Sequence, residues 1–185
     1  LIVFVVVLSA CKDPKYPNLK DGLYADIQTN IGDVLVKLHY KKVPLTVANF
    51  IALAEGNHPD LIGKKEIKPF YDGLKFHRVI KDFLIQSGKL NISEDESLKT
   101  FFSDELDPNL KHDGPGVLSM VNLGKPYTNS TEFFITHKAT PWLDGYDKRG
   151  NKKPCGKYGT ACHTVFGKVI LGQNVVDRIK SNDLI

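Results

Sequence analysis

The sequence lacks the short motifs that mark several large classes of enzyme. It contains no Gly-x-Ser-x-Gly and no His-Glu-x-x-His pattern, so the usual signatures of serine hydrolases and zinc proteases are missing. Its Ser, His and Asp residues show no motif that would assemble a catalytic triad, and no glycine-rich phosphate loop is present. A hydrolase therefore has little support.

The chain also lacks internal repeats, low-complexity segments and a long block of like charge. Its 25 Lys and Arg against 21 Asp and Glu give a formal net charge of +4, and the lysines are spread along the chain. This pattern indicates a solvated surface, and we expect no nucleic-acid partner. With 185 residues and 42% apolar content, the chain can bury the core of one domain, whereas a second full domain would be cramped.

Long apolar runs are rare, and the one at the start of the chain is short. Leu1–Leu8 is an unbroken run of Leu, Ile, Val and Phe, whereas spanning a bilayer takes about 20 residues. The run resembles the end of a signal-peptide core, and the Leu8-Ser-Ala-Cys11 that follows resembles the lipobox of bacterial lipoproteins. A buried N-terminal strand is the alternative. We favour the lipobox because the apolar run stops at Cys11.

This interpretation divides the chain into three parts. Residues 1–10 are expected to be the remnant of a signal peptide, residues 11–22 a lipidated Cys11 with a polar, proline-bearing tether, and residues 23–185 the folded domain. Lys12 follows the cysteine where an aspartate would signal retention in the inner membrane. We therefore expect a protein of the bacterial cell envelope that is held only by its lipid, in the outer membrane facing the periplasm, with the cell surface as the alternative.

Periodicity predicts many short strands and two helices. Alternating apolar and polar residues predict a β-hairpin at Tyr24–Thr29 and Asp33–Leu38. Apolar residues recur at helical spacing between Pro44 and Gly56, and a second short helix is expected at Val175–Ile179. This combination favours a mainly β fold, a closed or nearly closed antiparallel barrel. The other expected strands are 74–80, 83–86, 117–121, 133–136 and 165–170.

Four ordered motifs carry a resemblance to a known family. They are Phe76-His-Arg-Val-Ile-Lys-Asp-Phe-Leu-Ile-Gln-Ser-Gly88, Gly114-Pro-Gly-Val-Leu-Ser-Met-Val-Asn122, Glu132-Phe-Phe-Ile-Thr136, and Trp142-Leu-Asp-Gly145 with His163-Thr-Val-Phe-Gly-Lys-Val169. From Tyr24 onward the chain resembles the cyclophilins, a family of peptidyl-prolyl cis-trans isomerases. The resemblance implies a closed antiparallel barrel of about eight strands flanked by two α-helices. Only residues 181–185 follow the second helix, so we expect a very short last strand or a fragment.

The activity that the resemblance implies is rotation of X-Pro peptide bonds in exported proteins, which assists their folding. The rotation barrier is ~20 kcal/mol, and because no bond is broken the reaction needs no nucleophile, metal or cofactor. The enzyme has to stabilise the twisted amide more than either planar form. A hydrogen-bond donor aimed at the prolyl nitrogen and a pocket for the proline ring meet this requirement.

The resemblance also implies which residues form the site. Arg78 matches the catalytic arginine, and its permanent charge and fork of N–H groups suit a donor. Gln86 is expected to hydrogen-bond the substrate and to help place Arg78, and Asn122 to hold the substrate backbone, mostly through main-chain bonds. His77 and Phe133 are expected to be structural. The other expected site residues form the proline pocket (Phe83, Leu84, Phe134, Leu143) or surround it (Val121, Glu132, Trp142, His163).

Two positions depart from the family pattern. Glu132 stands where glutamine is usual, and a carboxylate there would either pair with Arg78 and hold it or compete with the substrate for its N–H groups. Val121 replaces a usual alanine and narrows the groove. Glu132, together with the insertion at residues 146–162, supports an alternative function, a weakly active or inactive module that binds proline-containing segments. The intact arginine and pocket residues favour the enzyme.

An insertion, residues 146–162, separates the last two motif segments and is rich in Gly and Lys. It contains Cys155 and Cys162, which are expected to form a disulfide beside the site, in a compartment that permits disulfides. A zinc site of Cys155, Cys162 and His163 lacks a fourth ligand, and independent thiols are a further alternative. The sequence gives no sign of an oligomer, so we expect a monomer.

Overall fold

The computed structural model describes residues 4–7, 14–59, 69–89 and 101–185. No helix within these ranges combines the length and the apolar character needed to cross a membrane. Cys11, the predicted lipidation site, lies outside the described residues. In chain order the elements are β1 (Phe4–Val7), β2 (Leu23–Thr29), β3 (Gly32–Leu38), α1 (Pro44–Ala54), β4 (Arg78–Ile80), β5 (Leu84–Ser87), β6 (Val117–Met120), β7 (Phe133–Thr136), β8 (Val165–Leu171) and α2 (Gln173–Val176).

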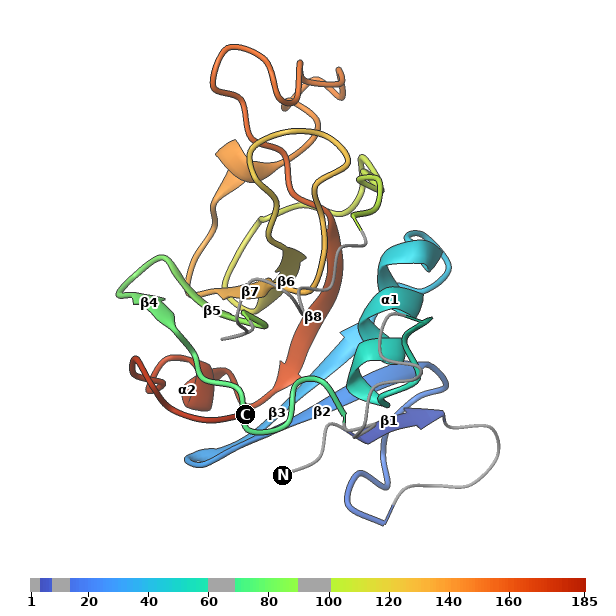
Figure 1. Cartoon of the computed structure of the whole chain (residues 1–185), viewed down its shortest axis with the longest axis vertical. Helices are drawn as coiled ribbons and strands as arrows, with labels where there is room; N and C mark the ends of the chain where they lie inside the picture. The colour runs from blue at the N-terminus through green and yellow to red at the C-terminus, as the bar shows by residue number, and fades with distance from the viewer. Residues whose placement is uncertain (1–3, 8–13, 60–68, 90–100) are drawn as a thin grey trace.

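The strands form one antiparallel sheet in the order β1-β2-β3-β8-β6-β7-β5-β4. Figure 1 shows the long strands β2, β3 and β8 on one side of a curled sheet, and the short strands β4 to β7 on the other. The pairing register shifts between Leu35 and Val36 on β3 and between Leu118 and Ser119 on β6. Such bulges bend a strand and increase its twist, which allows the sheet to curl.

The described residues do not confirm a closed barrel. The two ends of the sheet, β1 and β4, are not paired with each other in the described strand order. The C-terminal residues instead connect the β2–β3 hairpin to the segment that precedes β4. Leu184 accepts a hydrogen bond from the Asn30 N–H at the tip of the β2–β3 hairpin, and Ile185 donates to the Leu74 carbonyl before β4. The expected last strand is thus reduced to a single bridge between Lys75 and Leu184.

The eight strands of the sheet are not the eight that were expected for the domain. Seven of the strands lie within the predicted domain, and the eighth, β1, lies in the apolar run at the start of the chain. β1 pairs antiparallel with β2, which corresponds to the strand alternative for that run. The fold is therefore mainly β, with seven strands of the domain in a curled antiparallel sheet and two helices.

Helix α1 begins at Pro44, whose fixed φ suits the first helical position. The carboxylate of Glu105 caps this end from a distant loop, since its oxygens accept hydrogen bonds from the backbone N–H of Leu45 at 3.2 Å and of Thr46 at 2.6 Å. A negative charge at a helix N-terminus also complements the helix dipole. The cap joins α1 to the segment that contains Asp104, which accepts a hydrogen bond from Asn122.

The main core lies between α1 and the concave sheet, and its centre is aromatic. The ring of Phe50 on α1 lies 5.1 Å from that of Tyr71, 5.7 Å from that of Phe133 on β7 and 5.2 Å from that of Phe166 on β8. Phe50 is fully buried. It therefore ties the helix to both halves of the sheet.

We predict that Phe50→Ala lowers the free energy of unfolding by about 3–5 kcal/mol, because it removes a fully buried ring and leaves a cavity. Chemical denaturation measures this change. Leu45→Ala on the same helix is the matched control, since Leu45 is 47% exposed and its loss should change the free energy by about 0.5 kcal/mol or less. Equal losses in both variants would contradict the placement of α1.

Candidate active site

Strand pairing places the central site residues in one row. Arg78 on β4 pairs with Gln86 on β5, and Gln86 pairs with Phe134 on β7. Phe134 in turn pairs with Ser119 on β6. Directly paired residues of antiparallel strands project from the same face of the sheet. A guanidinium, an amide and an aromatic ring therefore lie side by side.

The opposite face of the same strands belongs to the main core. Ile85 on β5, with Phe133 and Ile135 on β7, lies one residue out of phase with the row and packs into the main core. Successive side chains of a strand alternate between faces. Phe133 therefore packs into the main core, whereas Phe134 lies on the opposite face, beside Gln86.

The residues expected to hold a proline ring form a small apolar cluster separate from the main core. Leu84, Phe134 and Leu143 are its buried members, and Phe83 and Val121 pack against them. A 3₁₀ turn over Pro141–Leu143 brings Leu143 to the cluster and leaves Trp142 at its rim. The Trp142 ring is 56% exposed, and its centroid lies 5.9 Å from that of Phe83.

A chain of hydrogen bonds holds the side chain of Arg78. Its Nη1 donates to Gln86 Oε1 at 3.0 Å, and Gln86 Nε2 donates to Glu132 Oε2 at 2.7 Å. His77 Nε2 lies 3.2 Å from the same Glu132 oxygen. Glu132 therefore reaches Arg78 through the Gln86 amide, whereas the sequence left open a direct pair with Arg78 or competition with the substrate. Arg78 itself is exposed to solvent.

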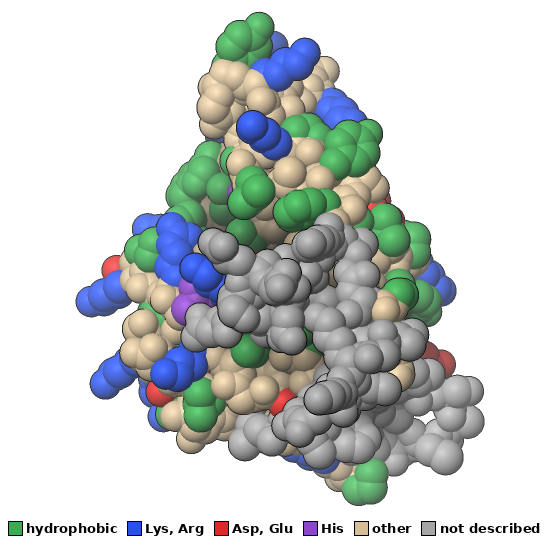
Figure 2. Space-filling model, in the orientation of Figure 1, with side chains coloured by type: hydrophobic (Ala, Val, Ile, Leu, Met, Phe, Trp, Pro, Cys, Tyr) green, Lys and Arg blue, Asp and Glu red, His purple; other side chains and the backbone are tan. Residues whose placement is uncertain are grey.

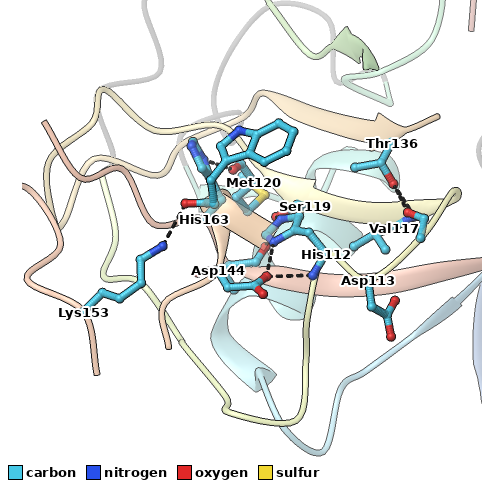
Figure 3. A network of polar contacts seen from close by, with 12 residues as sticks. His112, Asp113, Val117, Ser119, Met120, Thr136, Asp144, Lys153 and His163 are labelled. Carbon is cyan, nitrogen blue, oxygen red and sulfur yellow. Dashed lines mark hydrogen bonds and ion pairs between the residues drawn. The ribbon is translucent and has the colours of Figure 1, made fainter. Parts of the chain in front are cut away.

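Sequence reasoning missed a buried polar network beneath the pocket (Figure 3). Asp144 Oδ1 lies 2.7 Å from His112 Nδ1 and also accepts the His112 backbone N–H. His112 Nε2 lies 3.0 Å from Ser119 Oγ. The fold thus assembles an Asp-His-Ser chain that no motif had indicated. Ser119 is fully buried and can donate its hydroxyl to the Thr164 carbonyl at 2.8 Å, so it is not presented to a substrate as a nucleophile.

The network supports the pocket from below. The His112 ring stacks on the Phe134 ring, with centroids 5.8 Å apart and planes inclined by 12°. Asp144 directly follows Leu143 of the pocket wall. His112 and Asp144 therefore connect the Phe134 floor to the Leu143 wall. The only sequence signal for them was that Asp144 lies in the Trp142–Gly145 motif.

His163 closes another side of the pocket. Its ring meets the Phe134 ring edge to face at 5.4 Å, and Nδ1 lies 2.9 Å from the Met120 carbonyl oxygen. Because a carbonyl only accepts, Nδ1 carries the hydrogen. Burial lowers the pKa of His163 to about 4. The ring is therefore neutral at pH 7.

The side chain of Asn122 is used to hold the loops together. Its Nδ2 donates to the Cys162 carbonyl at 2.7 Å and to Asp104 Oδ1 at 3.2 Å, and its Oδ1 accepts the Gly124 N–H at 3.1 Å. Because the side chain is used for these three bonds, the main chain of Asn122 is left to bind a substrate, which is the role expected of this residue from its sequence motif.

The insertion is attached directly beside the pocket. Cys155 and Cys162 are bonded to each other, with their Cα atoms 5.5 Å apart. Lys153 Nζ donates to the Trp142 carbonyl at 2.8 Å. Among the described residues, no group of three or more His, Cys, Asp and Glu side chains is placed to hold a metal ion.

Comparisons with known proteins show the family to which the chain belongs. A family model described as cyclophilin type peptidyl-prolyl cis-trans isomerase matches residues 24–184. Peptidyl-prolyl cis-trans isomerase-like 1 of Rhizopus delemar is 36% identical over 156 residues, which cover 83% of this chain and 77% of that protein. Peptidyl-prolyl cis-trans isomerase ppi1 of Schizosaccharomyces pombe is 37% identical, with 83% of each chain covered.

Solved structures are similar as well. A cyclophilin-type peptidyl-prolyl cis-trans isomerase of Cryptosporidium parvum, crystallised in the presence of the dipeptide Ala-Pro, superposes with a TM-score of 0.61 at 29% sequence identity. The superposition covers 88% of this chain and 91% of that one.

We predict that His163 makes stability depend on pH. Its pKa rises from about 4 when folded to about 6.5 when unfolded, so the unfolded state binds more protons between these values. Stability is therefore complete above about pH 6.5 and falls by up to about 3 kcal/mol as pH falls to 4. His163→Gln keeps a donor for the Met120 carbonyl but cannot take up a proton, so its stability should fall less between pH 7 and pH 4. Denaturant titrations of both proteins from pH 7 to 4 measure the difference, and parallel curves would contradict the assignment.

Proposed function

The chain belongs to the cyclophilin family of peptidyl-prolyl cis-trans isomerases, and from this we propose that Arg78 is its catalytic residue and that the Phe134 cluster is its proline pocket. The protein is a peptidyl-prolyl cis-trans isomerase that binds proline-containing peptides. The observation that carries the assignment of residues is the row across β4, β5 and β7, in which Arg78 and Phe134 flank Gln86.

Arg78 would act on the nitrogen of the X-Pro bond. In the planar amide the nitrogen lone pair is delocalised into the carbonyl, which creates the barrier of ~20 kcal/mol. Twisting the bond returns the lone pair to the nitrogen, where it can accept a hydrogen bond. Arg78 gives one N–H to Gln86 and has five in all, so it can donate to the twisted nitrogen. This bond forms only in the transition state, which is the condition for raising the rate.

The apolar cluster would hold the proline ring still while the carbonyl side turns. Leu84, Phe134 and Leu143 are buried and provide the floor and wall. The His112 ring stacked on Phe134 and the His163 ring against its face fix the orientation of the floor. A rigid pocket favours binding because its side chains lose little conformational entropy when the substrate arrives.

The relay through Gln86 would position Arg78 and not inhibit it. Two hydrogen-bonding groups, Gln86 Nε2 and His77 Nε2, already approach the Glu132 carboxylate. The carboxylate therefore orients the Gln86 amide, whose oxygen points to Arg78. This arrangement supports an active enzyme over a module that only binds.

We predict that Arg78→Ala lowers kcat/KM for a short X-Pro peptide by about 10²- to 10³-fold, the usual effect of removing one donor to a transition state. Cis-to-trans conversion measures the rate. Arg178→Ala is the matched control, because Arg178 lies on the exposed surface and donates to the Asn174 carbonyl. Full activity of the folded Arg78→Ala protein would refute its catalytic role.

We propose further that the isomerase is a lipid-anchored monomer of the bacterial cell envelope, tethered through Cys11 and acting on exported proteins. The support is the run Leu1–Leu8 followed by Leu8-Ser-Ala-Cys11 and the polar tether. The Cys155–Cys162 disulfide suits an oxidising compartment outside the cytosol. Lys12 after the cysteine favours the outer membrane, facing the periplasm.

We predict that Cys11→Ser in the full precursor moves the protein from the membrane to the soluble fraction, because it removes the acceptor of the lipid. Lys12→Asp should keep the lipid and move the protein to the inner membrane. Fatty-acid labelling and membrane fractionation read both outcomes. An unlabelled wild type, or labelling that survives Cys11→Ser, would contradict the anchor.

A further inference from the structure

Residues 146–162 form a loop that leaves the domain after Gly145 and returns at His163, and we name it the basic finger. Figure 1 shows it, in orange, at one extreme of the longest axis of the molecule, and β1 with the start of β2 toward the other. None of the isomerase chemistry described above uses its side chains beyond the contact of Lys153 with Trp142.

The basic finger carries the whole excess charge of the protein. Asp147 is its only acidic residue. The rest of the chain has 20 basic and 20 acidic residues, which cancel, so the net charge of +4 resides in the finger. Although the lysines are spread along the sequence, the basic residues outside the finger are matched by an equal number of acidic residues, whereas those of the finger are not. Its basic residues are Lys148, Arg149, Lys152, Lys153 and Lys157.

The single carboxylate of the finger is turned inward. Asp147 accepts hydrogen bonds from the backbone N–H groups of Asn151 and Arg149, both at 2.8 Å, and from Asn151 Nδ2 at 3.1 Å. The bonds from Asn151 hold the pKa of the Asp147 carboxyl below its usual value. The carboxylate shapes the turn, while Lys148 and Arg149 beside it are exposed.

The finger is also ordered in advance. The Cys155–Cys162 disulfide closes its second half, and the Lys153 N–H donates to the Gly145 carbonyl at 2.9 Å at its base. Gly156 packs so closely on Pro126 that an added Cβ would lie 2.4 Å from the proline ring. A surface ordered before binding loses little entropy when a partner arrives.

The base of the finger is hydrogen-bonded to the segment that carries Trp142 and Leu143. Lys153 Nζ bonds the Trp142 carbonyl, and the backbone N–H of His163 donates to the Leu143 carbonyl at 3.0 Å. Large apolar side chains are exposed around this end: Tyr158 is 94% exposed, Leu123 72% and Tyr127 70%. Figure 2 shows green apolar and blue cationic side chains together at this end of the molecule.

We propose that the basic finger is a docking surface for acidic polypeptide, and that it binds Asp- and Glu-bearing segments of a client whose proline lies in the pocket. The inference rests on the proposed function, because the finger starts from the Trp142–Gly145 segment of the pocket wall. Positive charge complements carboxylates, and exposed tyrosines add contact area at low entropic cost. The position of the finger, far from the tethered end, favours a client chain over the membrane surface.

The test uses the whole domain and one X-Pro peptide extended by a short tail of Glu, Gln or Lys, on either side of the proline. At low ionic strength the Glu tail should lower KM roughly tenfold relative to the Gln tail, and the Lys tail should raise it. The difference should vanish near 1 M salt, where the Debye length is about 3 Å. A KM that is independent of the tail, on both sides of the proline, would overturn the proposal.

Matched variants separate the finger from net charge. Changing Lys148, Arg149, Lys152 and Lys157 together to Gln should abolish the tail effect and leave kcat/KM on the Gln-tailed peptide unchanged. Changing Lys20, Lys41, Lys138 and Lys180 to Gln removes the same charge elsewhere and should keep the tail effect. Equal loss in both variants would show that net charge alone is responsible and would refute the proposal.

Two further measurements separate failure of the isomerase function from failure of the docking proposal. If the Gln-tailed peptide is not isomerised, the proposed function fails. Docking is then still measured by fluorescence anisotropy of a labelled Glu-rich peptide without proline. Such a peptide should bind the wild type and not the finger variant. Binding of a single-stranded oligonucleotide of equal charge, tighter than that of the peptide and dependent on the finger, would overturn acidic polypeptide as the ligand.

Discussion

The alternation of side chains along β5 and β7 is the constraint on which both the fold and the site depend. Ile85, Phe133 and Ile135 face the aromatic core around Phe50, and Gln86 and Phe134 face the opposite side of the sheet. A slip of one residue in the register would exchange the two faces. The same backbone hydrogen bonds that bury the core therefore set Arg78, Gln86 and Phe134 side by side, and the core stabilises the geometry of the site.

A buried polar network supports the Phe134 ring that the sheet positions. It lies beneath Phe134, where His112 contacts Asp144 on one side and Ser119 on the other. The Ser119 hydroxyl in turn contacts the Thr164 carbonyl. Burying such groups is unfavourable unless every partner is satisfied. In return the network fixes the ring orientation of His112, on which Phe134 is stacked. The proposed pocket thus combines an apolar surface with a polar support that resists rotation of the Phe134 ring.

Much of this was predictable from local patterns. Alternation predicted the β2–β3 hairpin, and Pro44 predicted the start of α1. The ordered motifs named Leu84, Phe134 and Leu143, which the fold brings together in one apolar cluster. Long-range effects were not accessible. His112 has no motif of its own, and it reaches Asp144 only because the chain folds back over many residues. The relay from Glu132 through Gln86 depends on strand register, and barrel closure depends on which segments meet at the sheet ends.

The most direct test uses the single tryptophan as a reporter of the pocket. Trp142 lies at the rim, 5.9 Å from Phe83. With an X-Pro peptide and a small amount of enzyme, exchange NMR should show cross-peaks between the cis and trans forms, and the Trp142 indole N–H signal should shift as the peptide is added. Exchange without any shift of that signal, or a shift without exchange, would contradict the account that the Arg78 row and the Phe134 pocket together perform the isomerisation.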